Sequence, residues 1–172
     1  MNVCYREAIV EDAAGIANVE VVSQQYGYRE FLPATHLDSM SISDRTQGWQ
    51  NALQSGDPDR TVVAVHVEKV IGFMRVGKTK DVGVAGITYL FVLREYWGIG
   101  VGQALMSKAT DFMRDFGFAS ALLYVYRDNV RGRRFYEWLG WKPDGRTYDH
   151  VFEGKIFQLL CYVRSVEALQ NP

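Results

Sequence analysis

Apolar and polar positions along the 172-residue chain follow two different periods. Residues 61–67 and 84–93 are short runs rich in β-branched and other apolar side chains, which predicts buried strands. After residue 102, and again at 130–139, apolar side chains recur three or four positions apart, which predicts helices with one buried face. The pattern therefore predicts a fold in which strands and helices share one core.

Turn residues and helix caps divide the rest of the chain into further elements. The expected elements in chain order are a strand at 2–8, a helix from 11 to about 25, a short helix at 35–40, a helix at 44–54, strands at 61–67, 70–76 and 84–93, a long helix closed at 116–118, a strand at 121–126, a helix at 130–139, a strand from 141, a turn at 143–145 and a last strand at 151–163 with a kink near 154–155. The short helix at 35–40 lies within a loop, and without it the order is β-α-α-β-β-β-α-β-α-β-β. The chain contains no repeat, linker or low-complexity segment. We therefore expect a single α/β domain over residues 1–172.

Three glycines at every second position separate the strand at 84–93 from the long helix. Gly98, Gly100 and Gly102 lie where unpaired backbone N–H groups and the positive end of the helix dipole meet, an arrangement that binds phosphate. Their spacing is not Gly-x-Gly-x-x-Gly, and no lysine follows the last glycine, so the loop is neither a dinucleotide fingerprint nor a P-loop. A plain turn between strand and helix remains an alternative.

Two stretches resemble the motifs of the GNAT superfamily of N-acetyltransferases. Residues 90–105, LFVLREYWGIGVGQAL, resemble its acetyl-CoA motif, in which an apolar-apolar-Val triplet precedes Gln/Arg-x-x-Gly-x-Gly/Ala. Gly100 and Gly102 match the glycines, whereas Trp97 departs from the Gln/Arg position. Residues 129–141, NVRGRRFYEWLGW, match the second motif of Asn, six residues, Tyr and a Leu-Gly-aromatic ending. The resemblance covers residues 61–162 well and the first sixty residues loosely.

The resemblance implies a GNAT-type mixed, mostly antiparallel sheet of six or seven strands flanked by about four helices. It further implies that the strands at 84–92 and 121–126 splay apart and leave a cleft. It also implies that acetyl-CoA is the co-substrate. The main chain of Leu90, Phe91 and Val92 would bind the pantetheine arm, with the Val92 N–H facing the thioester oxygen. The residues whose N–H groups would hold the pyrophosphate are Gly98, Ile99, Gly100, Val101, Gly102 and Gln103.

Tyr136 and Asn129 of the second motif have two interpretations each. Tyr136 is the candidate proton donor to the leaving thiolate, but it could instead only pack beside Phe135 and Trp138. Asn129 is either a plain helix cap or a cap that also binds the cofactor arm. Three arginines could reach the 3′-phosphate of the cofactor or could form a solvated helix face; they are Arg131, Arg133 and Arg134.

The general base and the acceptor site are less defined. Many members of the family use a glutamate at positions where this chain has Gly86 and Tyr124. Deprotonation of the amine could run through water to Asp128, Tyr124 or His150, or could occur in bulk solvent. By analogy with the family, we expect the acceptor site at residues 26–38 and 148–153, where aromatic side chains with a carboxylate would suit an amine with an apolar or cationic body. Core packing is the alternative for those aromatic residues.

Composition and charge exclude several other classes of protein. Hydrophobic residues make up 48% and charged residues 23%, and the formal net charge is −1, so nothing indicates a nucleic-acid or membrane surface. Cys4 and Cys161 have no metal-ligand spacing, and no metal is expected. No signal peptide or membrane-length apolar run is evident, which predicts a cytoplasmic protein.

We therefore expect transfer of the acetyl group of acetyl-CoA to a primary amine of a small molecule or peptide. Two alternatives remain, a transferase of another acyl group and a non-catalytic acyl-CoA-binding sensor. A homodimer is an open expectation, because members of the family are often dimers.

Overall fold

The protein is built on a mixed sheet of seven strands. The computed structural model describes residues 1–56 and 58–166. The strands are β1 (Cys4–Glu7), β2 (Arg60–His66), β3 (Lys69–Lys78), β4 (Val84–Val92), β5 (Ser120–Tyr126), β6 (Lys142–Phe152) and β7 (Lys155–Ser165). They lie in the order β1-β2-β3-β4-β5-β7-β6. The β4–β5 pair is parallel and the other five neighbouring pairs of the described residues are antiparallel, which confirms the expected mixed, mostly antiparallel sheet.

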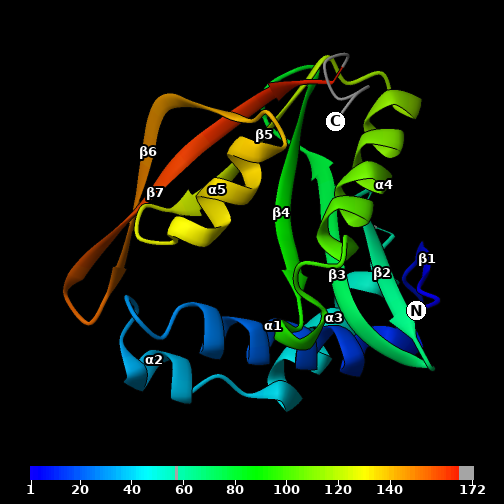
Figure 1. The fold of residues 1–172 in the computed structure, drawn as a ribbon, viewed down its shortest axis with the longest axis horizontal. Coiled ribbons are helices and arrows are strands. Elements are labelled where there is room, and N and C mark those ends of the chain that lie inside the picture. Colours follow the sequence, from blue (N-terminus) through cyan, green and yellow to red (C-terminus); the bar gives the residue numbers. More distant parts are fainter. Residues whose placement is uncertain (57, 167–172) are drawn as a thin grey trace.

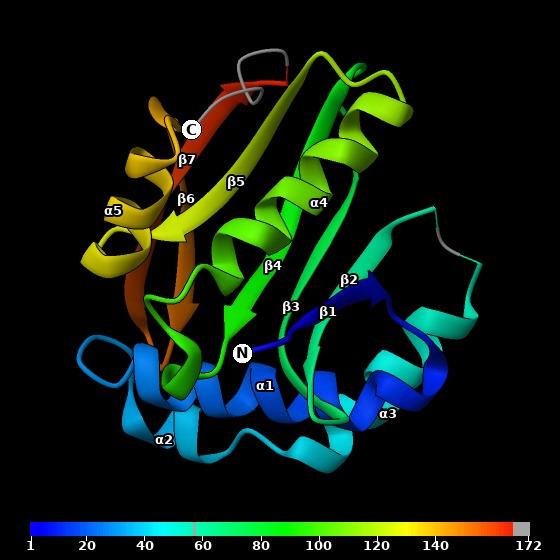
Figure 2. The same cartoon turned by 45° about the vertical axis from the view of Figure 1, so that its right-hand side comes forward.

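Helices cover both faces of this sheet (Figures 1 and 2). The described residues form five α-helices: α1 (Ala13–Gly27), α2 (Ala34–Asp38), α3 (Ile42–Gln54), α4 (Val101–Asp115) and α5 (Val130–Trp138). Neighbouring strand residues point to opposite faces, so Val62 packs into the core beneath α4 while Val63 packs into the core beneath α1 and α3. Burial on both faces explains why β2 is an apolar run without polar alternation.

The parting of β4 and β5 is the feature that shapes the functional region. The two strands pair only from Val84 to Ile87 of β4, opposite Ser120 to Leu123 of β5. Beyond that point β4 continues beside β3, and β5 continues beside β7. Figure 1 shows the two strands close together at one end and apart at the other. The divergence that the family resemblance implied is therefore confirmed.

The last two strands differ from the sequence prediction. β6 runs through the predicted turn at 143–145, and the predicted kink near residue 154 is the hairpin turn itself. Pro143 pairs with Tyr162 and Thr147 with Leu160, so residues 144–146 bulge out opposite Cys161. Glu153 and Gly154 make the turn with φ of 50° and 74°. A bulge and a turn both favour glycine and proline, and for that reason the sequence pattern placed the turn at the wrong site.

Two further expectations bear on the chain as a whole. The expected single domain over 1–172 includes residues 57 and 167–172, which lie outside the described residues. Within the described part of the chain, no helix combines the length and the apolar character needed to cross a membrane.

Candidate functional site

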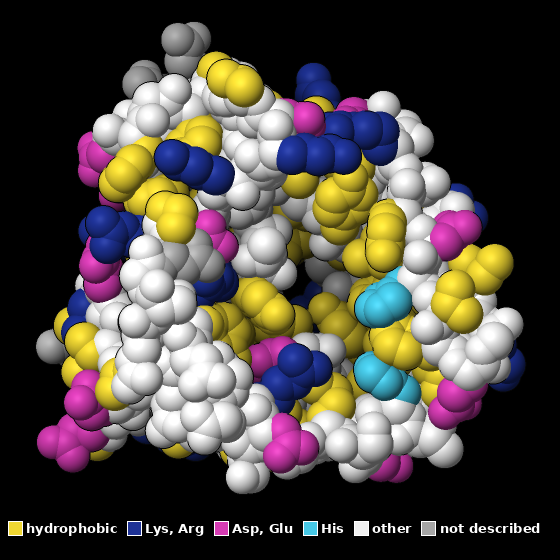
Figure 3. Space-filling view, turned by 180° about the vertical axis from the view of Figure 1, so that it is seen from behind, with side chains coloured by type: hydrophobic (Ala, Val, Ile, Leu, Met, Phe, Trp, Pro, Cys, Tyr) yellow, Lys and Arg dark blue, Asp and Glu magenta, His cyan; other side chains and the backbone are white. Residues whose placement is uncertain are grey.

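A cleft of about 1410 Å³ opens where β4 and β5 part. It is bounded by the end of α1, by β4, by the glycine loop between β4 and α4, by β5 and by α5. Figure 3 shows a hollow on the face opposite to that of Figure 1, surrounded mainly by hydrophobic side chains and with histidine side chains on one side. The predicted site residues that line the cleft are Leu90, Phe91, Val92, Gly98, Gly100, Val101, Gly102, Gln103, Asn129 and Tyr136.

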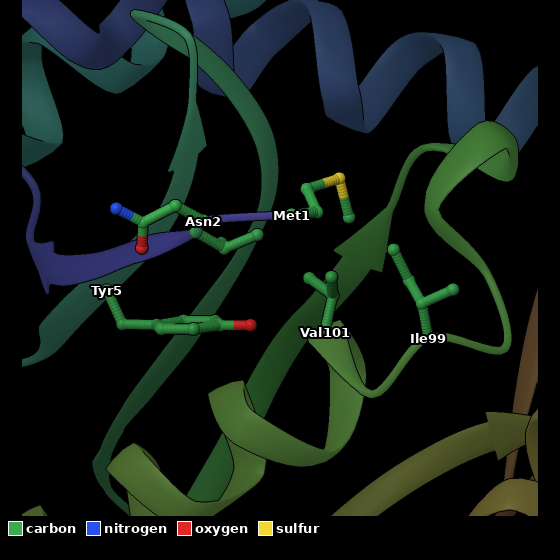
Figure 4. A pocket seen from close by; sticks show the side chains of 6 residues that line it. Met1, Asn2, Tyr5, Ile99 and Val101 are labelled. Carbon is green, nitrogen blue, oxygen red and sulfur yellow. The ribbon is translucent and has the colours of Figure 1, made fainter.

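Ile99 is the predicted site residue that does not line this cleft. Its side chain lines a smaller hollow of about 470 Å³ beside the N-terminal strand, together with Met1 and Tyr5 (Figure 4). Val101 lines both hollows. Ile99 can therefore contribute to the large cleft only through its main chain.

The glycines of the loop are required for two different physical reasons. Gly98 and Gly100 have φ of 76° and 90°, in the left-handed region that other residues rarely adopt. Gly102 lies within the first turn of α4, where a Cβ would come within 3.3 Å of the ring of Phe135 on α5. The first two glycines thus shape the loop, and the third lets α4 approach α5.

Six consecutive N–H groups of this loop have no acceptor in the described part of the chain. Among the described residues, none accepts a hydrogen bond from the backbone N–H groups of residues 98–103. The next amide, of Ala104, donates to the Gly100 carbonyl at 3.0 Å and begins the regular helical pattern. Unpaired donors at the positive end of a 15-residue helix form a site for an anion.

The end of β4 presents alternate main-chain groups to the cleft. The Leu93 N–H donates to the Ile71 carbonyl of the neighbouring segment at 2.9 Å, so the amides of Phe91 and Leu93 point toward β3. The amides of Leu90 and Val92 consequently point toward the edge that β5 has left. The main-chain N–H of Phe91 lies on the β3 side, and the expectation that Phe91 binds the pantetheine arm stays a prediction.

Trp97, which stands where the family motif has Gln or Arg, contacts both the end of β4 and α5. Its indole Nε1–H donates to the Val92 carbonyl at 2.7 Å. The guanidinium carbon of Arg131, on α5, lies 3.4 Å from the centroid of the indole ring, and the edge of Tyr26 packs on the ring at 5.6 Å. Trp97 therefore joins the glycine loop to α5 and holds a cation, Arg131, which lines the same cleft as the loop glycines.

The other two arginines of α5 are placed differently from Arg131. Arg133 donates through Nε to the Tyr162 hydroxyl at 3.3 Å and through Nη1 to the Arg127 carbonyl at 3.1 Å, so it is occupied in packing α5 against β7. Arg134 lies on the exposed face of the helix.

Tyr136 packs and Asn129 caps α5, as one of the two interpretations of each residue expects, and their roles toward a cofactor stay predictions. The Tyr136 ring packs on Phe135 and Trp141 at centroid distances of 5.5 and 6.4 Å, and the residue also lines the cleft. Burial raises the pKa of the Tyr136 phenol, so the phenol stays protonated. The Asn129 side chain accepts from the Gly132 N–H at 2.9 Å as a helix cap, and Asn129 lines the cleft as well.

The two segments expected to hold the acceptor come together at one end of the cleft. Thr35 donates a hydrogen bond to Glu153, and the His36 ring lies 4.1 Å from the ring of Phe152. Tyr28 and Phe31 pack against Tyr126 at 5.4 and 5.6 Å. The wall between these segments is therefore mainly aromatic.

Sequence reasoning missed Tyr126, whose hydroxyl lies 2.9 Å from His150 Nδ1. No signal in the sequence pairs these residues, because β7 lies between their strands. Of the three residues considered for the base, Tyr124 and His150 line the cleft and Asp128 does not.

Comparison with known proteins gives a family match over the same region. The model of the acetyltransferase (GNAT) family matches residues 25–141, a segment that includes the glycine loop and Tyr136. The chain is 31% identical over 132 residues to YuaI, an uncharacterized N-acetyltransferase of Bacillus subtilis (strain 168), and the match covers 74% of this chain and 73% of YuaI. It is 37% identical over 91 residues to an uncharacterized N-acetyltransferase of Archaeoglobus fulgidus, covering 49% of this chain and 60% of that protein.

Solved structures with the same fold include acetyltransferases crystallised with their cofactor. The PaiA N-acetyltransferase of Thermoplasma acidophilum in complex with coenzyme A aligns with a TM-score of 0.75 at 21% identity, over 96% of this chain and 99% of that one. YncA of Salmonella typhimurium, a putative acetyltransferase with its cofactor acetyl-CoA, aligns with a TM-score of 0.71 at 17% identity, over 96% and 95% of the two chains. At these identities the likeness shows the fold.

The left-handed backbone of the loop predicts a stability effect. Gly100→Ala should lower the free energy of unfolding by about 1–2 kcal/mol, because a Cβ is disfavoured at a φ of 90°. Gly48→Ala is the matched control: Gly48 lies inside α3 with open space around its Cα, so the change should raise stability by about 0.5–1 kcal/mol. Urea unfolding of both variants measures the difference. Equal stability of Gly100→Ala and wild type would contradict the loop geometry.

Proposed function

Because the chain belongs to the acetyltransferase (GNAT) family, we propose that it is an N-acetyltransferase that moves the acetyl group of acetyl-CoA directly to a primary amine of a small molecule or peptide. The observation that carries this proposal is the convergence of unpaired N–H groups on one cleft. The amides of residues 98–103 form one part of the cleft wall. The edge of β4 at Leu90 and Val92, which β5 leaves unpaired, forms another part.

Different groups of the cleft suit different parts of coenzyme A. The amides of residues 98–103 suit the diphosphate, because an anion replaces the hydrogen-bond acceptors that these donors lack. The Leu90 and Val92 main chain suits the amides of the pantetheine arm, which would pair with β4 as an additional strand does. That PaiA and YncA were crystallised with coenzyme A and acetyl-CoA supports the assignment by analogy of fold.

The proposed reaction is one direct displacement. The neutral amine nitrogen attacks the thioester carbon, a C–N bond forms, and the C–S bond breaks. The Val92 N–H would stabilise the developing oxyanion, and the Tyr136 hydroxyl would donate its proton to the leaving thiolate. A phenol with a pKa of about 10 is a weaker acid than a thiol with a pKa of about 8.5, which costs about 2 kcal/mol. Burial raises the pKa of Tyr136 further, so the proton must move as the C–S bond breaks.

Tyr136→Phe should lower kcat by about 100-fold, because it removes the proton donor while keeping the ring packing. Binding of acetyl-CoA should change little. Thiol release with a panel of amines measures turnover, and calorimetry measures binding. Tyr5→Phe, at a tyrosine of β1 outside the cleft, is the control and should behave as wild type.

Full turnover of Tyr136→Phe would remove this residue from the mechanism. A wild-type protein that binds acetyl-CoA tightly but acetylates none of the amines would instead favour a non-catalytic sensor.

We also infer that Arg131 supplies a cation to the diphosphate and that Trp97 holds it in place. Arg131→Ala and Trp97→Leu should each weaken binding of coenzyme A by about tenfold, which corresponds to about 1.4 kcal/mol. Trp97→Arg, which places a cation on the loop itself, should bind at least as well as wild type. Arg134→Ala, at an arginine of the same helix that does not line the cleft, should have no effect on calorimetric affinity.

Calorimetry with 3′-dephospho-coenzyme A separates the two phosphate sites. The loss in Arg131→Ala should be the same with this probe as with coenzyme A. A loss seen only with coenzyme A would place Arg131 at the 3′-phosphate and contradict the proposal.

A further inference from the structure

The reaction proposed above requires a base, and the inference drawn here rests on that function. An α-amino group has a pKa of about 8 and a lysine-like amine of about 10.4, so most of an amine acceptor is protonated at neutral pH. A base with a pKa near the working pH removes such a proton most effectively. The structure lacks a carboxylate at the two positions where many family members carry one, which are Gly86 and Tyr124 here.

Of the titratable side chains that line the cleft, one is suited to act as the base. Asp59 is paired with the Arg75 guanidinium at 3.3 Å, and Glu30 lies exposed beyond the end of α1. The phenols are too basic, since burial raises the pKa of Tyr126 to about 12 and also raises those of Tyr28 and Tyr136. His150 is the remaining titratable side chain of the described cleft residues whose ordinary range includes neutral pH.

His150 is held in a defined orientation beside Tyr126. The Tyr126 hydroxyl and His150 Nδ1 are 2.9 Å apart, and the two rings are parallel to within 2°. Phe152 packs on the imidazole at 4.2 Å, and Tyr28 packs on the Tyr126 ring at 5.4 Å. Both Tyr126 and His150 line the cleft. Packing on each side thus fixes the pair, as a catalytic relay requires.

We propose that Tyr126 and His150 together act as the general base. The acceptor nitrogen gives a proton to the Tyr126 oxygen while the Tyr126 hydroxyl gives its own proton to His150 Nδ1. One N–H bond of the ammonium and the original O–H bond break, and a new O–H bond and an Nδ1–H bond form. The phenol stays neutral throughout, and the positive charge moves from the amine to the imidazole. The imidazolium then returns its proton to water.

The charged and titratable groups around His150 belong to three neighbouring segments. His36 on α2 packs on Phe152, Glu153 lies in the hairpin turn, and Tyr148 is on the same strand as His150. Burial of the imidazole and, to a smaller extent, the charge of His150 lower the pKa of His36. The relay requires the His150 tautomer with hydrogen on Nε2, because Nδ1 must accept from the phenol.

A pH profile tests this relay. With acetyl-CoA and benzylamine as the probe amine, chosen for the aromatic wall, kcat/KM of wild type should rise with pH through an inflection that lies well below the pKa of the amine. His150→Gln should lower kcat/KM below this inflection by about 100-fold and move the inflection toward the pKa of the amine itself. Tyr126→Phe should show the same change. His66→Gln, on β2 and outside the cleft, is the matched control and should keep the wild-type inflection.

A His150→Gln variant that keeps the wild-type inflection would overturn the proposal. An increase in KM with kcat unchanged would also overturn it, since that outcome assigns His150 to binding of the acceptor. If wild type acetylates no amine at all, the proposed function fails rather than the relay alone.

A second measurement does not depend on the acceptor. The ¹⁵N chemical shifts of the His150 ring, assigned with His150→Gln, report which nitrogen carries the hydrogen. Wild type should show the Nε2–H tautomer, and Tyr126→Phe should shift the Nδ1 resonance because its donor is removed. Hydrogen on Nδ1 in neutral wild-type protein would overturn the relay.

Discussion

A sheet normally pairs the main-chain groups of each internal strand on both sides, and here that pairing stops halfway along β4. From Leu90 onward β4 has a neighbour only on its β3 side, because β5 has turned away after Leu123. Buried N–H groups without an acceptor are costly, so such an edge persists where a ligand or water supplies the missing acceptor. The parting of two strands is therefore the constraint on which the cleft and its chemistry depend.

The glycine loop between β4 and α4 also has main-chain N–H groups that find no acceptor among the described residues. Left-handed glycines turn the chain sharply after Trp97, and the first turn of α4 then exposes its amides beside the strand edge. Gly102 lets Phe135 approach, which brings α5, with Tyr136 and Arg131, to the other side of the opening. Main chain thus provides the donors, and α5 provides the side chains that would act on a ligand bound between them.

Much of the fold follows from local periodicity, whereas several features of the site depend on register. The period of two in the strands and of 3.6 in α4 located these elements from sequence, and the two motifs of the family implied the cleft. Whether the N–H of Phe91 or of Val92 faces the cleft depends on which residue of β4 pairs with Phe73 of β3. This register is set by the tertiary structure. The same holds for residues 144–146, where the signals of a bulge and of a turn coincide.

The sequence pattern also could not predict contacts between segments that lie far apart in the chain. Trp97 departs from the Gln/Arg position of the family motif, but its indole N–H donates to the Val92 carbonyl and its ring packs against Arg131 of α5. Tyr126 and His150 meet across β7 because the β6–β7 hairpin folds back beside β5, an outcome set by strand order. Aromatic and titratable side chains of this kind can be named from sequence, but their partners cannot.

Residue-resolved amide hydrogen exchange, measured with and without acetyl-CoA, tests the central claim most directly. If the unpaired donors of the cleft bind the cofactor, exchange should slow at Leu90, at Val92 and at residues 98–103. The amide of Phe91, which already points toward β3, should be unaffected. Slowing confined to the hollow beside Met1 and Tyr5, or an unchanged rate at Val92 in the saturated protein, would contradict the account.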